Sequence, residues 1–323
     1  MTEYRVVATK STVPVGTGQK LREVIQQTQT ESVRFDVVAN PEFLREGSAI
    51  EDFMRPNRVI IGTDSDQAVA IMKDLYRPLY LIETPIVVTD VATAELIKYA
   101  ANAFLATKIT FINEIADLCE KVGADVHDVA KGIGLDGRIG RKFLHPGPGY
   151  GGSCFPKDTA AMMHTARQAD ADFPLLQGVI DGNREQHERM VEKARRLVGG
   201  SLTGVDLGVW GLTFKANTDD VRDSPAVYIV RRLLEEGAVI RAYDPAARAD
   251  AVDLPGLTRV DTALEAAKGA SLLVVLTEWD EFRWLDFDAI GDALAARVVL
   301  DTRNLLDAVA LRRRGWIYEG VGR

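Results

Sequence analysis

The sequence predicts an α/β protein in three parts: a partial parallel sheet flanked by helices, an all-helical middle, and a second parallel sheet with its own helices. Two observations support this prediction. Short apolar runs alternate with helical segments in residues 1–88 and again in residues 201–323, which is the pattern of βαβ units. Between these parts, residues 90–122 contain neither Pro nor Gly and consist mostly of good helix formers.

The first part is expected to form only a portion of a doubly wound domain. Its apolar runs predict strands at 4–8, 35–39, 58–62 and 85–88, with helices at 16–27 and 65–75. Ser65 stands where the second helix needs an N-cap. The continuous run Val59, Ile60, Ile61 suits a buried parallel strand. Because these units are too few for a whole domain of this type, we expect its earlier half to be missing before Met1.

The middle part, residues 89–200, is expected to contain helices alone. About 33 residues without a break predict one helix of roughly 50 Å, which Gly123 ends. Shorter helices are expected at 126–131 and 156–168, and a longer one at 174–198. A helix as long as the first often forms an inter-domain spine or a dimer seam.

The alternation of strands and helices returns after Gly199 and Gly200. Strands are expected at 205–210, 238–243, 271–276 and 297–300, with helices at 225–236 and 262–268. This order predicts a second sheet of the Rossmann type in residues 201–323.

Composition excludes several classes of protein. Hydrophobic residues are 46% and charged residues 27% of the 323, as in ordinary globular proteins. The net charge of −8 argues against a nucleic-acid surface, although one local basic pocket could still bind an anion. The 2 cysteines, Cys119 and Cys154, are too few for a disulfide scaffold. No apolar run approaches the ~20 residues of a membrane span and the start does not resemble a secretion signal, so we expect a cytoplasmic protein without membrane contact.

The segment GPGYGGSCFPKD at 147–158 is the densest chemical signal in the chain. Its glycines let the backbone approach a ligand closely. Cys154 is expected just before a helix N-terminus, where the helix dipole favours a thiolate, and Lys157 and Asp158 follow in the first turn. A tight turn with a structural cysteine is the alternative, but the flanking sequence favours a nucleophile. Cys119, inside the long helix, is expected to be a packing residue.

Polar residues also recur along the long helix. Lys98 and Asn102 stand four residues apart and therefore share one face, which Asn113 continues about three turns later. From spacing alone this stripe is expected to face solvent. The alternative is that it lines a polar cleft.

Four further segments follow predicted strands, where ligands meet the carboxyl edge of a parallel sheet. They are 10–16, 40–47, 214–222 with its basic residues Lys215 and Arg222, and 301–304. Helix capping or an ordinary turn explains the first two equally well, and Arg303 in the last could simply be solvated. None of the four identifies a function by itself.

Taken together, the motifs resemble the nucleotide-sugar 6-dehydrogenases of the UDP-glucose/GDP-mannose dehydrogenase family, over essentially the whole chain. The matching blocks are STVPVGT at 11–17, NPEFLREGSAI at 40–50, KYAANAFLATKI at 98–109, GLDGRIG at 134–140, GPGYGGSCFPKD at 147–158, FKANTDDVRDSP at 214–225, TEW at 277–279 and DTRN at 301–304. The blocks that contain Cys154, Lys215 and Trp279 favour the UDP-glucose branch of this family.

The resemblance implies an NAD-dependent, four-electron oxidation of UDP-glucose to UDP-glucuronate. By the family pattern, Cys154 would bind the intermediate as a thiohemiacetal and then a thioester. Lys98 and Asn102 would stabilise the oxyanion, Asp158 would transfer protons, and Thr12 and Glu42 would order the hydrolytic water.

The same pattern implies the binding residues. Glu46, Lys157 and Arg222 would approach NAD. The UDP-sugar would be held by Leu44, Arg45, Phe143, Tyr150, Gly151, Lys215 and Arg303. Arg138 would reach the substrate from the neighbouring subunit of a homodimer built on the long helix.

One family feature is not found. The family's first domain begins with a strand and a G-x-G-x-x-G turn for the NAD pyrophosphate, and this chain starts at a later strand. We therefore keep two alternatives open beside the dehydrogenase: a truncated UDP-sugar-binding dimer with weak catalysis, and a dehydrogenase for another nucleotide-hexose.

Overall fold

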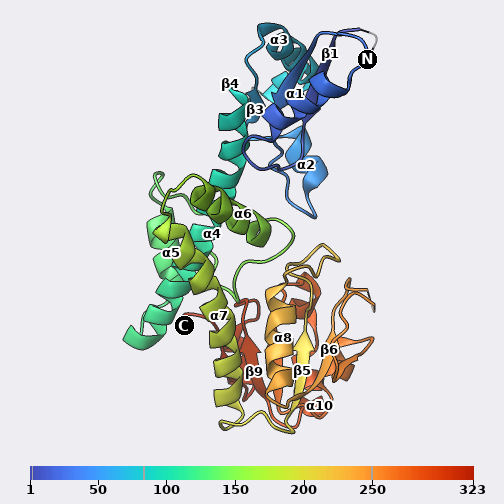
Figure 1. Ribbon diagram of the computed structural model, residues 1–323. Coiled ribbons are helices and arrows are strands. Elements are labelled where there is room, and N and C mark those ends of the chain that lie inside the picture. The colour runs from blue at the N-terminus through green and yellow to red at the C-terminus, as the bar shows by residue number, and fades with distance from the viewer. Residues whose placement is uncertain (2, 83, 249) are drawn as a thin grey trace. The chain divides into compact units, whose positions relative to one another are not determined.

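The computed structural model describes every residue of the chain except 2, 83 and 249 (Figure 1). The described residues divide into two compact units. The first contains Met1–Phe104 and Asp158–Phe173, and the second contains Leu105–Lys157 and Pro174–Arg323. The expected division into three domains at 1–88, 89–200 and 201–323 stays a prediction.

The first unit contains a sheet of four strands in the order β1-β2-β3-β4. Its elements are β1 (Arg5–Thr9), α1 (Thr17–Thr28), β2 (Phe35–Ala39), α2 (Ala49–Met54), β3 (Val59–Gly62), α3 (Asp66–Leu75), the 3-10 helix η1 (Arg77–Ile82) and β4 (Ile86–Thr89). Strands β1 and β2 are parallel, as are β3 and β4, while β2 meets β3 through a single antiparallel pair, Ala39 with Gly62. The expected parallel strand 58–62 and the Ser65 cap are both found, and Ser65 Oγ accepts from the Ala68 N–H at 3.2 Å.

Residues 91–197, all of which the structure describes, contain helices and connecting loops but no strand. These are α4 (Val91–Val122), α5 (Val126–Gly134), α6 (Phe155–Gln168) and α7 (Pro174–Leu197). The long helix is confirmed within one residue of the predicted start, and Gly123 ends it with a φ of 75°. Among the described residues, no helix has both the length and the apolar character needed to cross a membrane.

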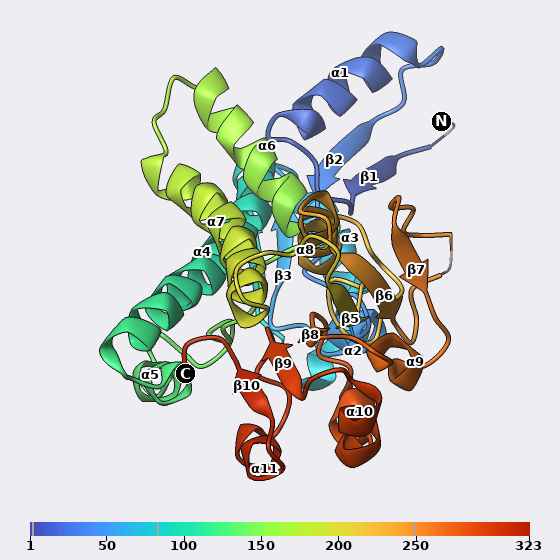
Figure 2. The same cartoon turned by 90° about the horizontal axis from the view of Figure 1, so that it is seen from below.

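The second unit contains a fully parallel sheet of six strands, in the order β10-β9-β8-β5-β6-β7 that Figure 2 shows. Its elements are β5 (Asp206–Trp210), α8 (Pro225–Glu235), β6 (Val239–Tyr243), β7 (Leu257–Arg259), α9 (Ala263–Ala267), β8 (Leu272–Val275), the 3-10 helix η2 (Asp280–Trp284), α10 (Phe287–Ala293), β9 (Val298–Asp301), α11 (Ala308–Arg313) and β10 (Ile317–Glu319). The first strand of this sheet in chain order, β5, lies in its middle, and the later strands are added on both sides of it. This strand order confirms the predicted Rossmann type.

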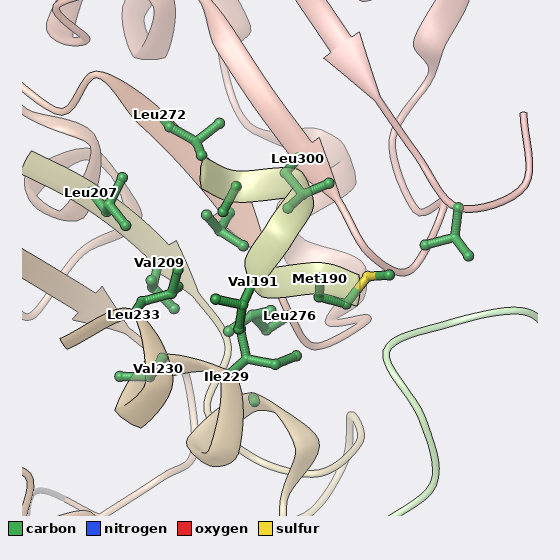
Figure 3. Packing of buried hydrophobic residues seen from close by; sticks show 14 of the residues in the cluster. Met190, Val191, Leu207, Val209, Ile229, Val230, Leu233, Leu272, Leu276 and Leu300 are labelled. Atoms are coloured by element: carbon green, nitrogen blue, oxygen red, sulfur yellow. The ribbon is translucent and has the colours of Figure 1, made fainter. Parts of the chain in front are cut away.

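Alternate side chains of β5 and its neighbours fill two cores on opposite faces of this sheet. Leu207 and Val209 join a cluster with residues of α7 and α8. Figure 3 shows this cluster, in which Met190 and Val191 of α7 lie among strand residues. Trp210 belongs to a separate cluster with α9, α10 and α11. Helix α7 is therefore anchored in the core along one of its faces.

Several short elements were not predicted. They are α2, β7, α10, α11, β10 and the two 3-10 helices. Most of them are three to seven residues long, too short for a helical or alternating period to stand out. Their omission does not affect the predicted fold class.

Candidate functional site

The glycine-rich loop of the second unit leads directly into helix α6. Cys154 is half-buried and stands immediately before Phe155, the first residue of α6, as expected. Its Sγ lies 3.6 Å from Ser153 Oγ. Cys119, by contrast, lies inside α4 and is only 3% exposed, and this burial raises the pKa of its thiol. Of the two thiols, Cys154 is therefore the one placed for chemistry.

Gly149 and Gly151 are two of the positions at which this loop requires glycine. Gly149 has a φ of 122°, and a Cβ there would lie 2.6 Å from Nε2 of His187. A Cβ on Gly151 would lie 2.3 Å from the carbonyl oxygen of Asp223. The loop therefore packs its backbone directly against α7 and the residues before α8.

Side-chain amides from α4 and α7 bind the backbone of the loop. The Gly147 N–H donates to Asn113 Oδ1 at 2.8 Å, and Gln186 Nε2 donates to the Gly147 carbonyl at 2.8 Å. Asn183 Oδ1 accepts from the Tyr150 N–H at 2.8 Å, and Asn183 Nδ2 donates to the Tyr150 carbonyl at 3.1 Å. Neither Asn183 nor Gln186 is predicted from the sequence as a site residue.

The polar stripe of α4 does not face solvent. Lys98, Asn102 and Asn113 are only 3%, 5% and 1% exposed, so the expectation from spacing alone is wrong. The reason is that each residue has a polar partner from a distant segment, and such partners leave no mark on the spacing of the helix itself.

Lys98 lies in a polar cluster of the first unit. Its Nζ is 3.3 Å from Glu42 Oε1 and 5.3 Å from the centre of the Phe43 ring. Glu42 Oε2 also accepts from the Leu44 N–H at 2.6 Å. Two residues of the segment after β2 thus contact the buried Lys98 ammonium group: Glu42 with its carboxylate and Phe43 with the face of its ring.

A second polar pair of the same unit joins α4 to α6. Asn102 Nδ2 donates to Asp158 Oδ2 at 2.6 Å, and both side chains are buried. Thr12, in the segment after β1, is half-buried, as are Leu44 and Glu46 in the segment after β2. Arg45 is exposed and forms a bidentate ion pair with the Asp52 carboxylate.

The N-terminus of α1 is occupied by a carboxylate from α4. Glu95 Oε2 accepts from the Gly16 N–H at 2.7 Å and Glu95 Oε1 from the Gly18 N–H at 2.8 Å. At the helix start that follows the segment 10–16, these two N–H groups are therefore already hydrogen-bonded within the protein.

Three residues of the segments 214–222 and 301–304 lie beyond the carboxyl edge of the second sheet. Phe214 and Lys215 follow β5, and Arg303 follows β9. This edge flanks the point where the strand order reverses, the usual ligand site of such sheets. Arg303 is not merely solvated, because its guanidinium donates to the carbonyls of Leu276 at 2.9 Å and Phe214 at 2.8 Å. The Lys215 ammonium lies 5.2 Å from the centre of the Phe214 ring.

Asp244, at the end of β6, fixes the segment after β5. Its Oδ2 accepts from the N–H groups of Leu212 and Thr213 at 2.6 and 2.9 Å, and its Oδ1 accepts from those of Ala246 and Ala247 at 2.9 and 2.7 Å. Burial alone would raise the pKa of this carboxyl, but these donors lower it below its usual value. Asp244 is not among the site residues predicted from the sequence.

The remaining expected site residues fall into two kinds. Phe143, at a φ of 65°, and the buried Tyr150 both have their rings against Phe155, at 6.2 and 6.1 Å between centroids. Lys157, Arg138 and Arg222 are exposed. Arg138 pairs with Asp136 at 2.6 Å and Arg222 with Asp220 at 2.7 Å.

Family models match three successive parts of the chain. All three bear the description "UDP-glucose/GDP-mannose dehydrogenase family": the NAD binding domain at residues 1–80, the central domain at 92–185 and the UDP binding domain at 208–308.

Whole proteins are also similar to this chain. It is 51% identical to the UDP-glucose 6-dehydrogenase of Rhizobium meliloti (strain 1021), over 99% of this chain and 74% of that protein. It is 45% identical to UDP-glucose 6-dehydrogenase TuaD of Bacillus subtilis (strain 168), over 99% of this chain and 69% of that protein. Among solved structures, a UDP-glucose dehydrogenase from Pyrobaculum islandicum superposes with a TM-score of 0.87 at 36% identity, over 99% of this chain and 71% of that one.

Proposed function

Because the chain belongs to the UDP-glucose/GDP-mannose dehydrogenase family, we infer that it oxidises UDP-glucose to UDP-glucuronate with NAD. One observation supports the chemistry above all others. The free thiol of Cys154 is half-buried at the end of a backbone-bound glycine loop and directly before the N-terminus of α6. A thiol in this position is suited to act as a nucleophile.

The reaction converts the C6 alcohol to a carboxylate in two oxidations. NAD⁺, when bound, accepts one hydride in each. Loss of a hydride and a proton from the alcohol gives an aldehyde, and the Cys154 thiol adds across its C=O bond to form a C–S bond and a hydroxyl group. A second loss of hydride and proton gives the thioester. Water then cleaves the C–S bond, which releases the carboxylate and restores the thiol.

We assign the polar clusters of α4 to charge and proton handling. The Lys98 ammonium and the Asn102 amide would stabilise the developing oxyanion, since both are buried groups held by polar partners. Asp158 would accept and return protons. Thr12 and Glu42 would order the water that cleaves the thioester.

The residues available for NAD fit its chemistry. The N-terminus of α1 is closed by Glu95, so it is not expected to hold the pyrophosphate. The half-buried Glu46 carboxylate can accept from ribose hydroxyl groups, and the exposed cations Lys157 and Arg222 can attract phosphates. We propose these three residues as NAD contacts.

We propose a second set of residues for UDP-glucose. Lys215 and Arg303 would bind the UDP portion, because both follow strands at the carboxyl edge where the sheet order reverses. The remaining members of this set come from the segment after β2 and from the glycine-rich region: Leu44, Arg45, Phe143, Tyr150 and Gly151.

We propose a homodimer built on α4. Phe111, Leu118 and Val122 are 47%, 52% and 67% exposed, and the first two stand seven residues apart, as on one seam of paired helices. The exposed Arg138 would then reach the substrate of the neighbouring subunit. A reducing compartment keeps thiols free, so we propose the cytoplasm as the place of action.

Absorbance of NADH tests the proposed reaction. With UDP-glucose and NAD⁺ the protein should form two NADH per sugar and UDP-glucuronate, and turnover should be lower with GDP-mannose and UDP-N-acetylmannosamine. Cys154→Ser should form no UDP-glucuronate, whereas Cys119→Ala, which removes the buried thiol, should remain active. Undiminished product from Cys154→Ser would exclude this thiol as the nucleophile. Calorimetric binding of UDP-glucose without binding of NAD⁺ would instead support a UDP-sugar-binding protein.

A further inference from the structure

We propose that Asn113, Asn183 and Gln186 are positioning residues, which fix the glycine-rich loop so that Cys154 meets the substrate carbon. The inference rests on the proposed function, in which that thiol forms the C–S bond. These three side chains, called the amide clamp below, come from α4 and α7 and bind backbone groups of one loop.

Asn183 binds both backbone groups of a single loop residue. Its Oδ1 accepts from the Tyr150 N–H at 2.8 Å while its Nδ2 donates to the Tyr150 carbonyl at 3.1 Å. A neighbouring β-strand would make the same pair of bonds. The Asn183 side chain therefore holds both backbone groups of Tyr150, which stands four residues before Cys154.

Gly147 is held in the same way by two side chains. Its N–H donates to Asn113 Oδ1 at 2.8 Å and its carbonyl accepts from Gln186 Nε2 at 2.8 Å. Both amides are buried, so these bonds are shielded from competing water. The two residues of the loop that the clamp holds stand on either side of Gly149, which has a φ of 122°.

The clamp is needed because the loop has little order of its own. Glycine restricts the backbone less than any other residue, and four of the six residues 147–152 are glycine. The helices that present the clamp are rigid by contrast. Met190 and Val191 of α7 lie in the core shown in Figure 3, and Ile112 and Ala116 of α4 are fully buried as well. Hydrogen bonds from α4 and α7 therefore fix the backbone of Gly147 and Tyr150 in this loop.

The clamp should matter for one oxidation more than the other. Conversion of the alcohol to the aldehyde does not use the thiol, whereas everything after the aldehyde does. A thiol displaced by about 1 Å can slow its reaction about a hundredfold. Loss of the clamp should therefore let the aldehyde escape before Cys154 captures it.

Two substitutions test the clamp with matched shape. Asn183→Leu and Gln186→Met remove the hydrogen bonds and keep most of the side-chain volume. Gln27→Met makes the same chemical change at an exposed position of α1 and is the control. If Asn183→Leu does not fold, Asn183→Asp keeps the acceptor for the Tyr150 N–H and replaces the donor to its carbonyl by a carboxylate oxygen.

The kinetic readout is the fate of the aldehyde. With semicarbazide present as a trap, the wild type and Gln27→Met should still form two NADH per UDP-glucose, and the clamp variants should approach one. Their kcat for UDP-glucuronate should fall about tenfold or more. At saturating UDP-glucose, their first turnover of NADH should stay within about threefold of the wild type, because that oxidation does not use the thiol.

Hydrogen exchange gives a readout independent of activity. Amides in the peptide 147–153 should exchange about tenfold faster in the clamp variants, as expected for loss of one hydrogen bond, with exchange elsewhere in α7 unchanged. Unchanged exchange of this peptide, or an equal slowing of both oxidations, would overturn the proposal. Absence of any NADH from the wild type would instead refute the proposed function, while the exchange experiment would still decide whether the amides fix the loop.

Discussion

Asp244→Asn is expected to destabilise the second sheet and weaken binding of UDP-glucose. The carboxylate accepts four backbone hydrogen bonds, two on each oxygen. An asparagine at this position can accept on one side only, and its NH₂ group would face two N–H donors on the other. Lys215 follows the segment that these bonds hold, so its placement depends on them.

The size of the effect follows from burial. Leu212 and Thr213 are fully buried, so their N–H groups cannot turn to water when the acceptor is lost. Each unsatisfied donor costs about 1–3 kcal/mol, which gives about 4 kcal/mol for the pair. This is a large part of the ~5–15 kcal/mol that stabilises a typical domain.

Tryptophan fluorescence during urea unfolding measures the effect directly. All 4 tryptophans lie between residues 210 and 316, so the signal reports the sheet that contains Asp244. Asp250→Asn is the matched control, because that exposed carboxylate pairs only with Arg248 in the described contacts and its loss should leave the midpoint unchanged. Equal midpoints for the two variants would refute the assignment of Asp244 as the residue that fixes this segment.

Comparison of the wild type with Asp244→Asn also tests how the free energy of unfolding depends on pH. The folded pKa of Asp244 lies below its usual value of 3.8, because the backbone donors outweigh burial. Its contribution is therefore complete above the unfolded pKa and is lost as the pH falls through the lower folded pKa. The difference between wild type and Asp244→Asn should stay constant from pH 8 to about pH 5 and shrink below pH 4.

Two further predictions concern packing and protonation. In Gly62→Ala the new Cβ would lie 2.3 Å from Ala94 Cβ, so β3 and α4 must separate at a cost of about 2 kcal/mol. Limited proteolysis should therefore cleave the first unit of this variant faster than that of the wild type. Gly132→Ala is the control, because its new Cβ meets open space, and it should resist proteolysis as well as the wild type or better. Burial lowers the pKa of His187 from 6.5 to about 4, so the folded protein resists its protonation and loses stability as the pH falls from 6.5 to 4. His187→Phe should reduce this loss in tryptophan-detected unfolding at pH 7 and pH 5, and an unchanged pH dependence would contradict the assignment.

Local patterns predicted most of the regular elements. The run without Pro or Gly predicted α4, and Ser65 was correctly placed as the cap of α3, because both features depend on residues within one or two turns. Helix α2 was missed because its six residues are too few for a helical period to stand out, and its apolar residues Ile50, Phe53 and Met54 remain 84%, 42% and 55% exposed.

The chemistry of the site was only partly visible in the sequence. The composition around Cys154 indicated a reactive thiol, and the structure does place that residue before α6. The same sequence gave no sign of Asp244, because an aspartate after a strand is common and its four partners are backbone groups brought near only by folding.

The sequence by itself determined which residues could share a helix face, as with Lys98 and Asn102, because the helical repeat is a property of neighbouring residues. Only the tertiary structure decided that this face is buried, since Glu42 and Asp158, the partners of those residues, each stand 56 positions away along the chain. It likewise decided that Asn183 and Gln186 bind the glycine-rich loop. A side-chain amide forms its hydrogen bonds with whichever backbone groups folding brings within reach, and no local pattern encodes that distance.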